Sequence, residues 1–152
     1  MILADTSAWV EYDRATGSPV DIRLSELIAE DGPLAVTDPV VMEVLAGART
    51  EQREADLRRL LLRFELLRFD VAADFHGAAR IYRRCRREGV IPRGLTDCMI
   101  AAVALRTEAI LLAHDADMNR VAKVVDIEMD QASYLIAGAR RASPNAGSSG
   151  PN

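Results

Sequence analysis

Several kinds of residue are scarce in this 152-residue chain, and each scarcity excludes a class of protein. The two cysteines, Cys85 and Cys98, are too few for a disulfide framework, and no CxxC pair suggests zinc. Both fall in helix-like stretches, so we expect small buried side chains in a reducing cytosol. Aromatic residues make up only 5% of the chain, so aliphatic residues must fill the core. No apolar run approaches the ~20 residues of a membrane span. Asp5 follows four residues without a basic segment, which argues against a signal peptide and predicts a cytoplasmic protein.

The remaining composition predicts one folded domain followed by a disordered tail. Hydrophobic residues at 49% and charged residues at 28% are typical of a globular protein. From position 138 onward the chain is rich in Gly, Ser, Pro, Asn and Ala and has no apolar periodicity, which is typical of disorder. We therefore expect a domain over residues 1–137 and a disordered tail over residues 138–152.

Positive charge is concentrated although the net charge is −4. Lys123 is the only lysine among 19 basic residues, and two segments are rich in arginine, one between positions 49 and 68 and one between 80 and 93. Two interpretations stay open: these are solvated helix faces, or they form a basic rim that attracts a polyanion. The number of arginines alone does not separate them.

Apolar patterning predicts strands that alternate with helices. Short apolar runs suit buried strands at 2–5, 34–36, 66–69 and 109–113, with an edge strand at 126–129. Helical spacing occupies 6–14, 19–30, 39–48, 51–64, 72–88, 96–107 and 115–124. This alternation predicts an α/β fold, a three-layer α/β/α domain with a short parallel central sheet.

Four acidic residues interrupt these apolar patterns. Asp5 ends the first strand, and Asp115 follows the strand at 109–113. Glu43 lies inside the run VVMEVL, and Asp97 shares a helical stripe with the apolar residues three, four and seven positions later. Each has a structural explanation, as a helix cap, a surface residue or a partner of the helix dipole. Ionised carboxylates are nevertheless rarely buried without partners.

The predicted fold brings these four carboxylates together. The carboxyl ends of parallel strands open onto one crevice, where Asp5 and Asp115 lie and which the helices of Glu43 and Asp97 can face. One pair of carboxylates about 4 Å apart costs roughly 4 kcal/mol at an effective dielectric near 20, so a proton or a cation must offset the repulsion. Oxygen ligands select a hard ion such as Mg²⁺ or Mn²⁺. Such an ion polarises a phosphoryl group and activates water, which is the chemistry of phosphodiester hydrolysis.

The same residues resemble the PIN-domain ribonuclease family. The similarity spans about residues 1–134 and rests on four segments in register: DTS at 5–7, VMEVLAG at 41–47, LTDCMIAA at 95–102 and HDAD at 114–117. The small size and the segment PRGLTDC most resemble VapC-type toxins of type II toxin–antitoxin pairs. One departure is Met118, because the family often has an aromatic residue after the last acidic pair.

This resemblance implies a Mg²⁺-dependent endoribonuclease toxin that cleaves cellular RNA, with Mn²⁺ as a possible substitute. It implies that Asp5 and Asp97 are the principal metal ligands, and that Glu43 and Asp115 complete the site and orient the attacking water. Asp117 is a further candidate, and three hydroxyls are expected to position the acids: Thr6, Ser7 and Thr96. A cognate VapB-type antitoxin and a homodimer are the implied protein partners.

Two other functions stay open at this point. A catalytically idle PIN scaffold would only bind RNA or a protein, although it has no reason to keep four mutually repelling acids. A phosphate-handling enzyme on a similar sheet would act on small phosphomonoesters and not on RNA.

Two surfaces are expected to contact partners. An apolar stripe on the helix at 19–30 and another on the helix from Glu51 belong either to the core, which the leucines of the second helix favour, or to a groove for an amphipathic antitoxin helix. We take the groove as the hypothesis; the first stripe is Val20, Leu24, Leu27 and Ile28. Five arginines before Asp97 are expected to hold RNA phosphates: Arg83, Arg84, Arg86, Arg87 and Arg93.

Overall fold

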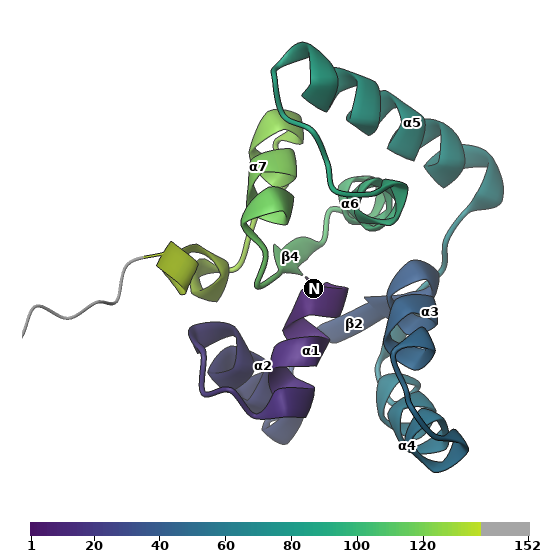
Figure 1. Cartoon of the computed structure of the whole chain (residues 1–152), viewed down its shortest axis with the longest axis vertical. Helices are drawn as coiled ribbons and strands as arrows, with labels where there is room; N and C mark the ends of the chain where they lie inside the picture. Colours follow the sequence, from purple (N-terminus) through teal and green to yellow (C-terminus); the bar gives the residue numbers. More distant parts are fainter. Residues whose placement is uncertain (138–152) are drawn as a thin grey trace, which may run out of the picture.

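The computed structural model describes residues 1–137 as a four-stranded parallel sheet covered by helices (Figure 1). The strands are β1 (Ile2–Ala4), β2 (Leu34–Thr37), β3 (Glu65–Leu67) and β4 (Ile110–Leu112). Their order in the sheet is β3-β2-β1-β4, and every neighbouring pair is parallel. The expected α/β class with a short parallel sheet is confirmed. The tail expected at 138–152 lies outside the described residues.

Each expected helix is present in residues 1–137, with ends that differ by a few residues. The helices are α1 (Thr6–Arg14), α2 (Pro19–Ala29), α3 (Asp38–Ala46), α4 (Glu51–Leu61), α5 (Val71–Arg87), α6 (Leu95–Thr107) and α7 (Ala116–Val125). Their starts follow local chemistry, since the side chains of Ser18, Thr50 and Asp70 accept hydrogen bonds from the first turns of α2, α4 and α5. No helix in this part of the chain is long and apolar enough to cross a membrane.

The predicted edge strand at 126–129 is wrong. Only an isolated parallel bridge between Met129 and Leu111 forms there. Asp126 ends α7 in the left-handed conformation, with φ of 59°, which turns the chain before a strand can lengthen. A 3₁₀-helix that periodicity did not predict, η1 (Gln131–Ala137), follows.

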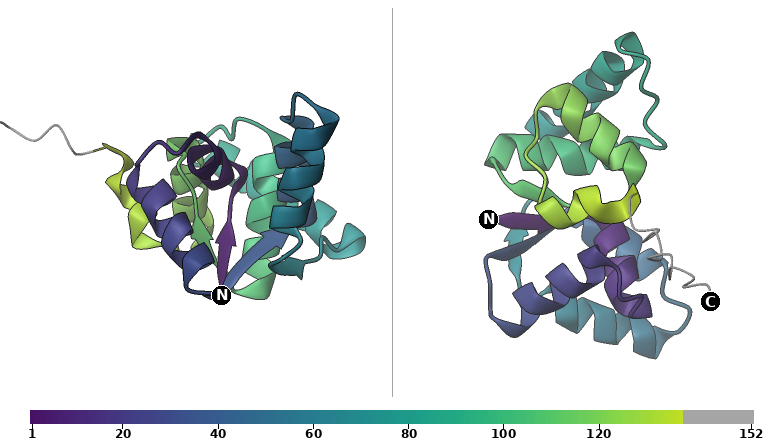
Figure 2. Two further views of the ribbon diagram at one scale, coloured as in Figure 1. Left: turned by 90° about the horizontal axis from the view of Figure 1, so that it is seen from below. Right: turned by 90° about the vertical axis from the view of Figure 1, so that its left-hand side faces the viewer.

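The connections place helices on both faces of the sheet. From β1 to β2 to β3 the chain steps in one direction, and from β3 to β4 it returns past β1. Because crossovers between parallel strands are right-handed, connections that run in opposite directions lie on opposite faces. Accordingly, α1, α2 and α4 lie on one side of the sheet, and α5, α6 and α7 on the other (Figure 2). This is the three-layer architecture expected from the sequence.

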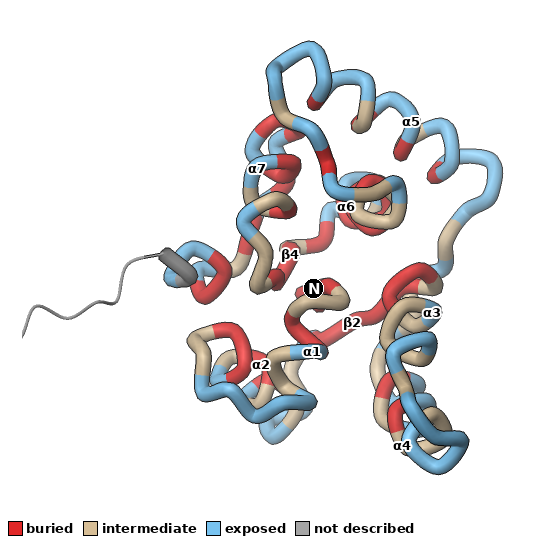
Figure 3. The backbone as a smooth tube through the Cα atoms, in the orientation of Figure 1, coloured by how far each residue is buried: buried red, intermediate tan, exposed pale blue. Residues whose placement is uncertain are grey.

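The core is centred on the sheet and is built from aliphatic side chains (Figure 3). Leu3 of β1 and Leu111 of β4 are fully buried. Cys85 of α5 and Cys98 of α6 are free and buried, as expected. The strand order reverses at β1, between β2 and β4, and in open α/β sheets ligands bind beyond the carboxyl ends of the strands at such a point.

The groove expected between α2 and α4 is wrong. Val20, Leu24 and Leu27 are at most 3% exposed, because they belong to the core. In addition, α1 packs against α2 on one side and against α3 on the other, and thus lies where the groove was expected. The apolar stripe of α2 covers the sheet and does not receive a partner.

Candidate active site

The first strand ends in a buried carboxylate that also begins α1. Asp5 is 4% exposed, and its Oδ2 accepts hydrogen bonds from the backbone N–H of Ser7 at 3.0 Å and from the Ser7 hydroxyl at 2.6 Å. Its Oδ1 is buried and has no hydrogen-bond partner among residues 1–137. Burial raises the pKa of Asp5 and outweighs the hydrogen bonds from Ser7, which lower it, while the charge of Glu43 raises it further. Asp5 is therefore both a helix cap and a carboxylate with one free buried oxygen.

Ser7 joins the ends of β1 and β4. Its Oγ donates to Asp5 and accepts a hydrogen bond from the backbone N–H of His114 at 2.9 Å. The backbone N–H of Asp5 donates to the carbonyl of Leu112 at 2.9 Å. Because His114 immediately precedes Asp115, these bonds fix the backbone that carries both aspartates. The expected role of Ser7 as a positioning hydroxyl agrees with this geometry.

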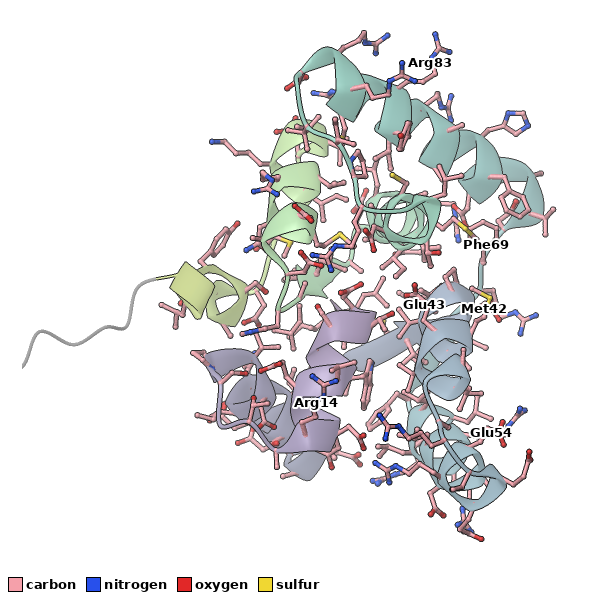
Figure 4. The ribbon with its side chains drawn as sticks, viewed as in Figure 1. Arg14, Met42, Glu43, Glu54, Phe69 and Arg83 are labelled. Atoms are coloured by element: carbon pink, nitrogen blue, oxygen red, sulfur yellow. The ribbon has the colours of Figure 1, made fainter. Side chains whose placement is uncertain are left out.

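Glu43 reaches the same place from α3. Its Oε2 accepts a hydrogen bond of 2.5 Å from the hydroxyl of Thr6, the residue after Asp5. Figure 4 shows Glu43 on the side of α3 that faces α1, whereas the neighbouring Met42 points to the other side. Met42 is 56% exposed and Glu43 is partly buried. The rotation that would put Glu43 on an outer surface, which the sequence left open, is therefore not adopted.

Asp97 approaches from the opposite helical layer, in the first turn of α6. It is partly buried, and burial together with the charges of Asp5, Asp115 and Glu43 raises its pKa to about 6. These are the three partners that the sequence predicted for it. The four carboxylates, contributed by residues far apart in the chain, therefore act electrostatically on one another.

Asp115 and Asp117 have different surroundings although they are two residues apart. Asp115 caps α7, accepting a hydrogen bond of 2.7 Å from the backbone N–H of Asp117. Arg93, from the loop between α5 and α6, lies 3.7 Å from Asp115 and 3.4 Å from Asp117. Arg120 also pairs with Asp117. Asp117 is thus paired with two arginines, and it is not among the charges that raise the pKa of Asp97. The surroundings of Asp117 therefore differ from those of the four acids that influence one another's charge.

The third expected hydroxyl differs from the other two. Thr6 and Ser7 bind Glu43 and Asp5, whereas no hydrogen bond joins Thr96 to any of the acids within residues 1–137. Sequence reasoning also missed the contact of Arg93 with the acids, because it assigned Arg93 to RNA phosphates only. No local sequence pattern indicates this contact, because the loop from 88 to 94 and the end of β4 meet only in the folded chain.

A hollow of about 530 Å³ opens beside Glu43, between α1, α3 and α4. Its walls combine apolar and basic side chains, among them Trp9, Val44, Leu57, Arg14, Arg49 and Arg53. Three helices contribute to it, so no single segment of the sequence indicated it. The hollow adjoins Glu43, and within it Arg53 is paired with Asp13.

The donor set fits a hard divalent cation. All four side chains offer carboxylate oxygens, which Mg²⁺ and Mn²⁺ prefer. Asp5 Oδ1 is buried without a partner, and the mutual charges raise the pKa of Asp97, so a cation would relieve both. In the arrangement of residues 1–137, no three acidic, histidine or cysteine side chains converge tightly enough to enclose an ion. The fit therefore rests on the orphaned oxygen and on the charges.

Comparisons with known proteins identify the family of this chain. A model of the PIN domain matches residues 2–124. Ribonuclease VapC11 from Mycobacterium tuberculosis is 42% identical over 129 residues, which cover 84% of this chain and 96% of VapC11. Ribonuclease VapC32 from the same species is 37% identical over 86 residues, 55% of this chain and 64% of that protein.

Two solved structures show the shared fold. One is VapBC2 from Rickettsia felis bound to a DNA fragment from its promoter, with a TM-score of 0.67 and 18% identity over 86% of this chain and 98% of that chain. The other is FitAcB from Neisseria gonorrhoeae, with a TM-score of 0.66 and 21% identity over 89% and 100% of the two chains. With the family match and the identity to VapC11, they lead to one conclusion: this chain belongs to the PIN-domain family, among the VapC ribonucleases.

Proposed function

We propose that this protein is a Mg²⁺-dependent endoribonuclease toxin that hydrolyses cellular RNA in the acidic crevice beyond β1 and β4. The observation that carries the proposal is the group of four carboxylates whose mutual charges, with burial, raise the pKa of Asp97 to about 6. Mn²⁺ takes the same oxygen ligands and is expected to replace Mg²⁺. An idle binding scaffold would gain nothing from this repulsion.

Each residue has a separate role in this proposal. Asp5, Glu43, Asp97 and Asp115 would hold the cation, which when bound polarises the scissile phosphate and lowers the pKa of the attacking water. Thr6 and Ser7 hold two of these carboxylates in place before substrate arrives, so less reorganisation is needed during the reaction. Glu43 uses one oxygen in a hydrogen bond within residues 1–137, which leaves the other to orient water. In Asp115, one oxygen accepts the backbone hydrogen bond of Asp117 and the other lies 3.7 Å from Arg93.

The activity can be tested with a matched pair of variants. Wild-type protein, Asp97→Asn and Asp117→Asn are incubated with a labelled RNA hairpin in Mg²⁺ or in excess EDTA. We expect wild-type cleavage in Mg²⁺ only, and a loss of more than about 100-fold in Asp97→Asn, since even supporting residues around a metal site are worth about 10–100-fold. Asp117→Asn should stay within a few-fold of wild type, because its carboxylate is paired with Arg93 and Arg120.

Three results would contradict the proposal. Wild-type cleavage in excess EDTA would exclude the metal-dependent mechanism. Undiminished cleavage by Asp97→Asn would place the reaction elsewhere. Hydrolysis of p-nitrophenyl phosphate at a rate similar to that of RNA would favour a phosphomonoesterase.

We further propose that the toxin works as a homodimer and is neutralised by a cognate VapB-type antitoxin in the cytoplasm. Exposed apolar side chains on α3, on α6 and in the loop before α6 support an interface: Met42 is 56% exposed, Leu95 61% and Ile91 74%. The place of Arg93 supports inhibition by an antitoxin arginine, because a guanidinium group already fits beside Asp115 and can pair with carboxylates through two hydrogen bonds. The two free thiols suit a reducing compartment.

The masses of the toxin alone and of its complex test the homodimer and the antitoxin. Sedimentation of the toxin alone should give twice the mass of one chain at micromolar concentration. Co-expression with the product of the neighbouring upstream reading frame should give a stable complex without ribonuclease activity. A monomer in the first measurement contradicts the dimer, and active, separate toxin in the second contradicts the pairing.

A further inference from the structure

Ion pairing divides the two arginine-rich segments into different kinds of surface. On α4, a guanidinium nitrogen of Arg58 lies 2.7 Å from Glu54, and Arg59 pairs with Asp56 one turn away. Arg53 of the same helix pairs with an aspartate of α1. The charge of this segment is therefore largely neutralised within the protein.

Three arginines near the end of α5 have no such partner. No carboxylate lies within ion-pairing distance, 4.0 Å, of Arg83, Arg86 or Arg87 in the part of the chain that the structure describes. Glu88, the acid nearest in sequence, lies 3.5 Å from Arg84 instead. We call Arg83, Arg86 and Arg87 the arginine ridge. Together they line a surface hollow of about 310 Å³, and no other residue contributes to it.

The fold requires the ridge to face solvent. The opposite side of α5, with Ala78, Ile81 and Cys85, is buried against α6. Arg86 and Arg87 follow Arg83 by three and four positions, so both side chains are neighbours of Arg83 on the helix surface, where like charges repel one another. Figure 4 shows Arg83 at the outer edge of α5. The negative end of the helix dipole attracts cations in the last turn, but Arg83 lies before that turn.

The chain leads from this ridge directly to the acidic site. The loop from residue 88 to 94 runs from the end of α5 to the start of α6 (Figure 1). Within it, Arg93 is 73% exposed and lies 3.7 Å from Asp115. Guanidinium groups therefore stand at both ends of this loop, at the ridge and at the site of the reaction.

We infer that the arginine ridge binds phosphates of the RNA substrate outside the scissile bond, and that the strand passes along the loop and Arg93 into the acidic crevice. This inference rests on the proposed function and keeps four of the five arginines that the sequence offered; the fifth, Arg84, lies 3.5 Å from Glu88. The three positive charges of the ridge lie within about 6 Å along the helix axis. A ligand that matches them must carry closely and regularly spaced negative charges, as a nucleic-acid backbone does. Only arginine side chains line the hollow, so it lacks the buried apolar anchor on which protein interfaces depend.

The test compares two pairs of adjacent arginines with the same change in charge. Binding of a fluorescent RNA hairpin is measured by anisotropy in EDTA, between 50 and 300 mM KCl, for wild type, Arg86→Gln/Arg87→Gln and Arg58→Gln/Arg59→Gln. Each lost phosphate contact should reduce the slope of log affinity against log salt by about 0.7–0.9, so the ridge pair should lose about 1.4–1.8. If affinities converge at 1 M salt, this is roughly 25–60-fold weaker binding at 0.1 M. Adding Arg83→Gln should reduce the slope by about a further 0.7–0.9.

The control pair should keep the wild-type slope. An unchanged slope in the ridge variants overturns the inference. An equal reduction of the slope in the ridge pair and the control pair also overturns it, because that result reflects net charge alone. Poly-L-glutamate should compete poorly; if its binding depends on the ridge more than RNA binding does, the surface serves an acidic protein instead. Thermal unfolding of every variant should stay within a few degrees of wild type, since all of these side chains are exposed.

Cleavage of the same hairpin in Mg²⁺ separates this inference from the proposed function. If wild-type protein cleaves but the slopes do not change, the ridge is wrong and the activity stands. If the slopes change as expected but no cleavage occurs, the ridge stands and the proposed activity is wrong.

Discussion

Asp97→Asn should make the metal-free fold more stable while it removes activity. Burial and three neighbouring carboxylates raise the pKa of Asp97 from 3.8 to about 6. One pKa unit corresponds to 1.36 kcal/mol, so full linkage would destabilise the folded state by about 3 kcal/mol above pH 6. Solvent reaches part of this side chain and screens the repulsion, which reduces the expected effect to about 1–2 kcal/mol. Asparagine keeps the shape of the side chain and removes the charge.

The effect has a defined dependence on pH. Because the folded protein binds the proton of Asp97 more tightly than the unfolded chain does, the contribution to stability is complete below pH 3.8. It is lost as the pH rises toward 6, and above pH 6 the charge opposes folding. The stability difference between Asp97→Asn and wild type should therefore be small near pH 4 and largest above pH 6.

Circular dichroism melts in EDTA measure this difference. At pH 7.5 the midpoint of Asp97→Asn should exceed that of wild type by about 2–8 °C, given about 2–4 °C per kcal/mol for a protein of this size. Mg²⁺ should then raise the wild-type midpoint and leave the variant almost unchanged, since binding to the native state alone stabilises it by about 2.7 kcal/mol at 100 times the Kd.

Asp117→Asn is the control and should not gain stability, because its carboxylate is paired with Arg93 and Arg120. A less stable Asp97→Asn protein at pH 7.5 without metal would refute the reasoning. So would a stability gain of the same size near pH 4.

Three further predictions concern other contacts. Thr6→Val removes the hydroxyl that donates to Glu43 at 2.5 Å, so cleavage in excess Mg²⁺ should fall about 10–100-fold at an almost unchanged melting midpoint; Thr6→Ser should restore most of the rate, and failure to do so would contradict a positioning role. Arg106→Met leaves Asp74, 2% exposed, without its guanidinium partner, and urea unfolding at pH 7 should show a loss of about 2–4 kcal/mol, less than for a fully buried pair because the arginine is 37% exposed. Burial raises the pKa of Asp74, but hydrogen bonds and the charge of Arg106 together hold it below its usual range, so this loss should shrink as the pH falls toward 3, and a constant loss would contradict the assignment. Burial raises the pKa of Cys98 to about 12, so a thiol reagent at pH 8 should label this residue no faster than the protein unfolds; rapid labelling of the native state would show that the thiol is accessible.

The order of helices and strands was predictable because its signals are local. Apolar runs indicated four strands, and caps such as Ser18 and Thr50 act on backbone groups within a turn. The four acids were also recognisable, because each stands in an apolar pattern where a solvated charge has no place. The edge strand predicted at 126–129 does not form, because Asp126 turns the chain in the left-handed conformation and an apolar pattern carries no information on φ.

Local patterns did not separate residues that differ only in distant neighbours. Asp115 and Asp117 have nearly the same local sequence, but loop residue Arg93 and helix residue Arg120 distinguish their surroundings. The stripe with Leu27 suits a core as well as a groove in sequence, and only the packing of α1 against α2 assigns it to the core.

Composition and local pattern thus sufficed for the fold class, the identity of the four acids and the presence of two basic segments. Tertiary structure alone decided which acids influence the pKa of Asp97 and which arginines have no ion-pair partner within residues 1–137. The hydrogen bond from Thr6 to Glu43 joins residues 37 positions apart, and that between Ser7 and His114 joins residues 107 positions apart. Electrostatic repulsion and ion pairing depend on distance in space, and chain topology sets that distance by bringing the ends of β1 and β4 to one edge of the sheet.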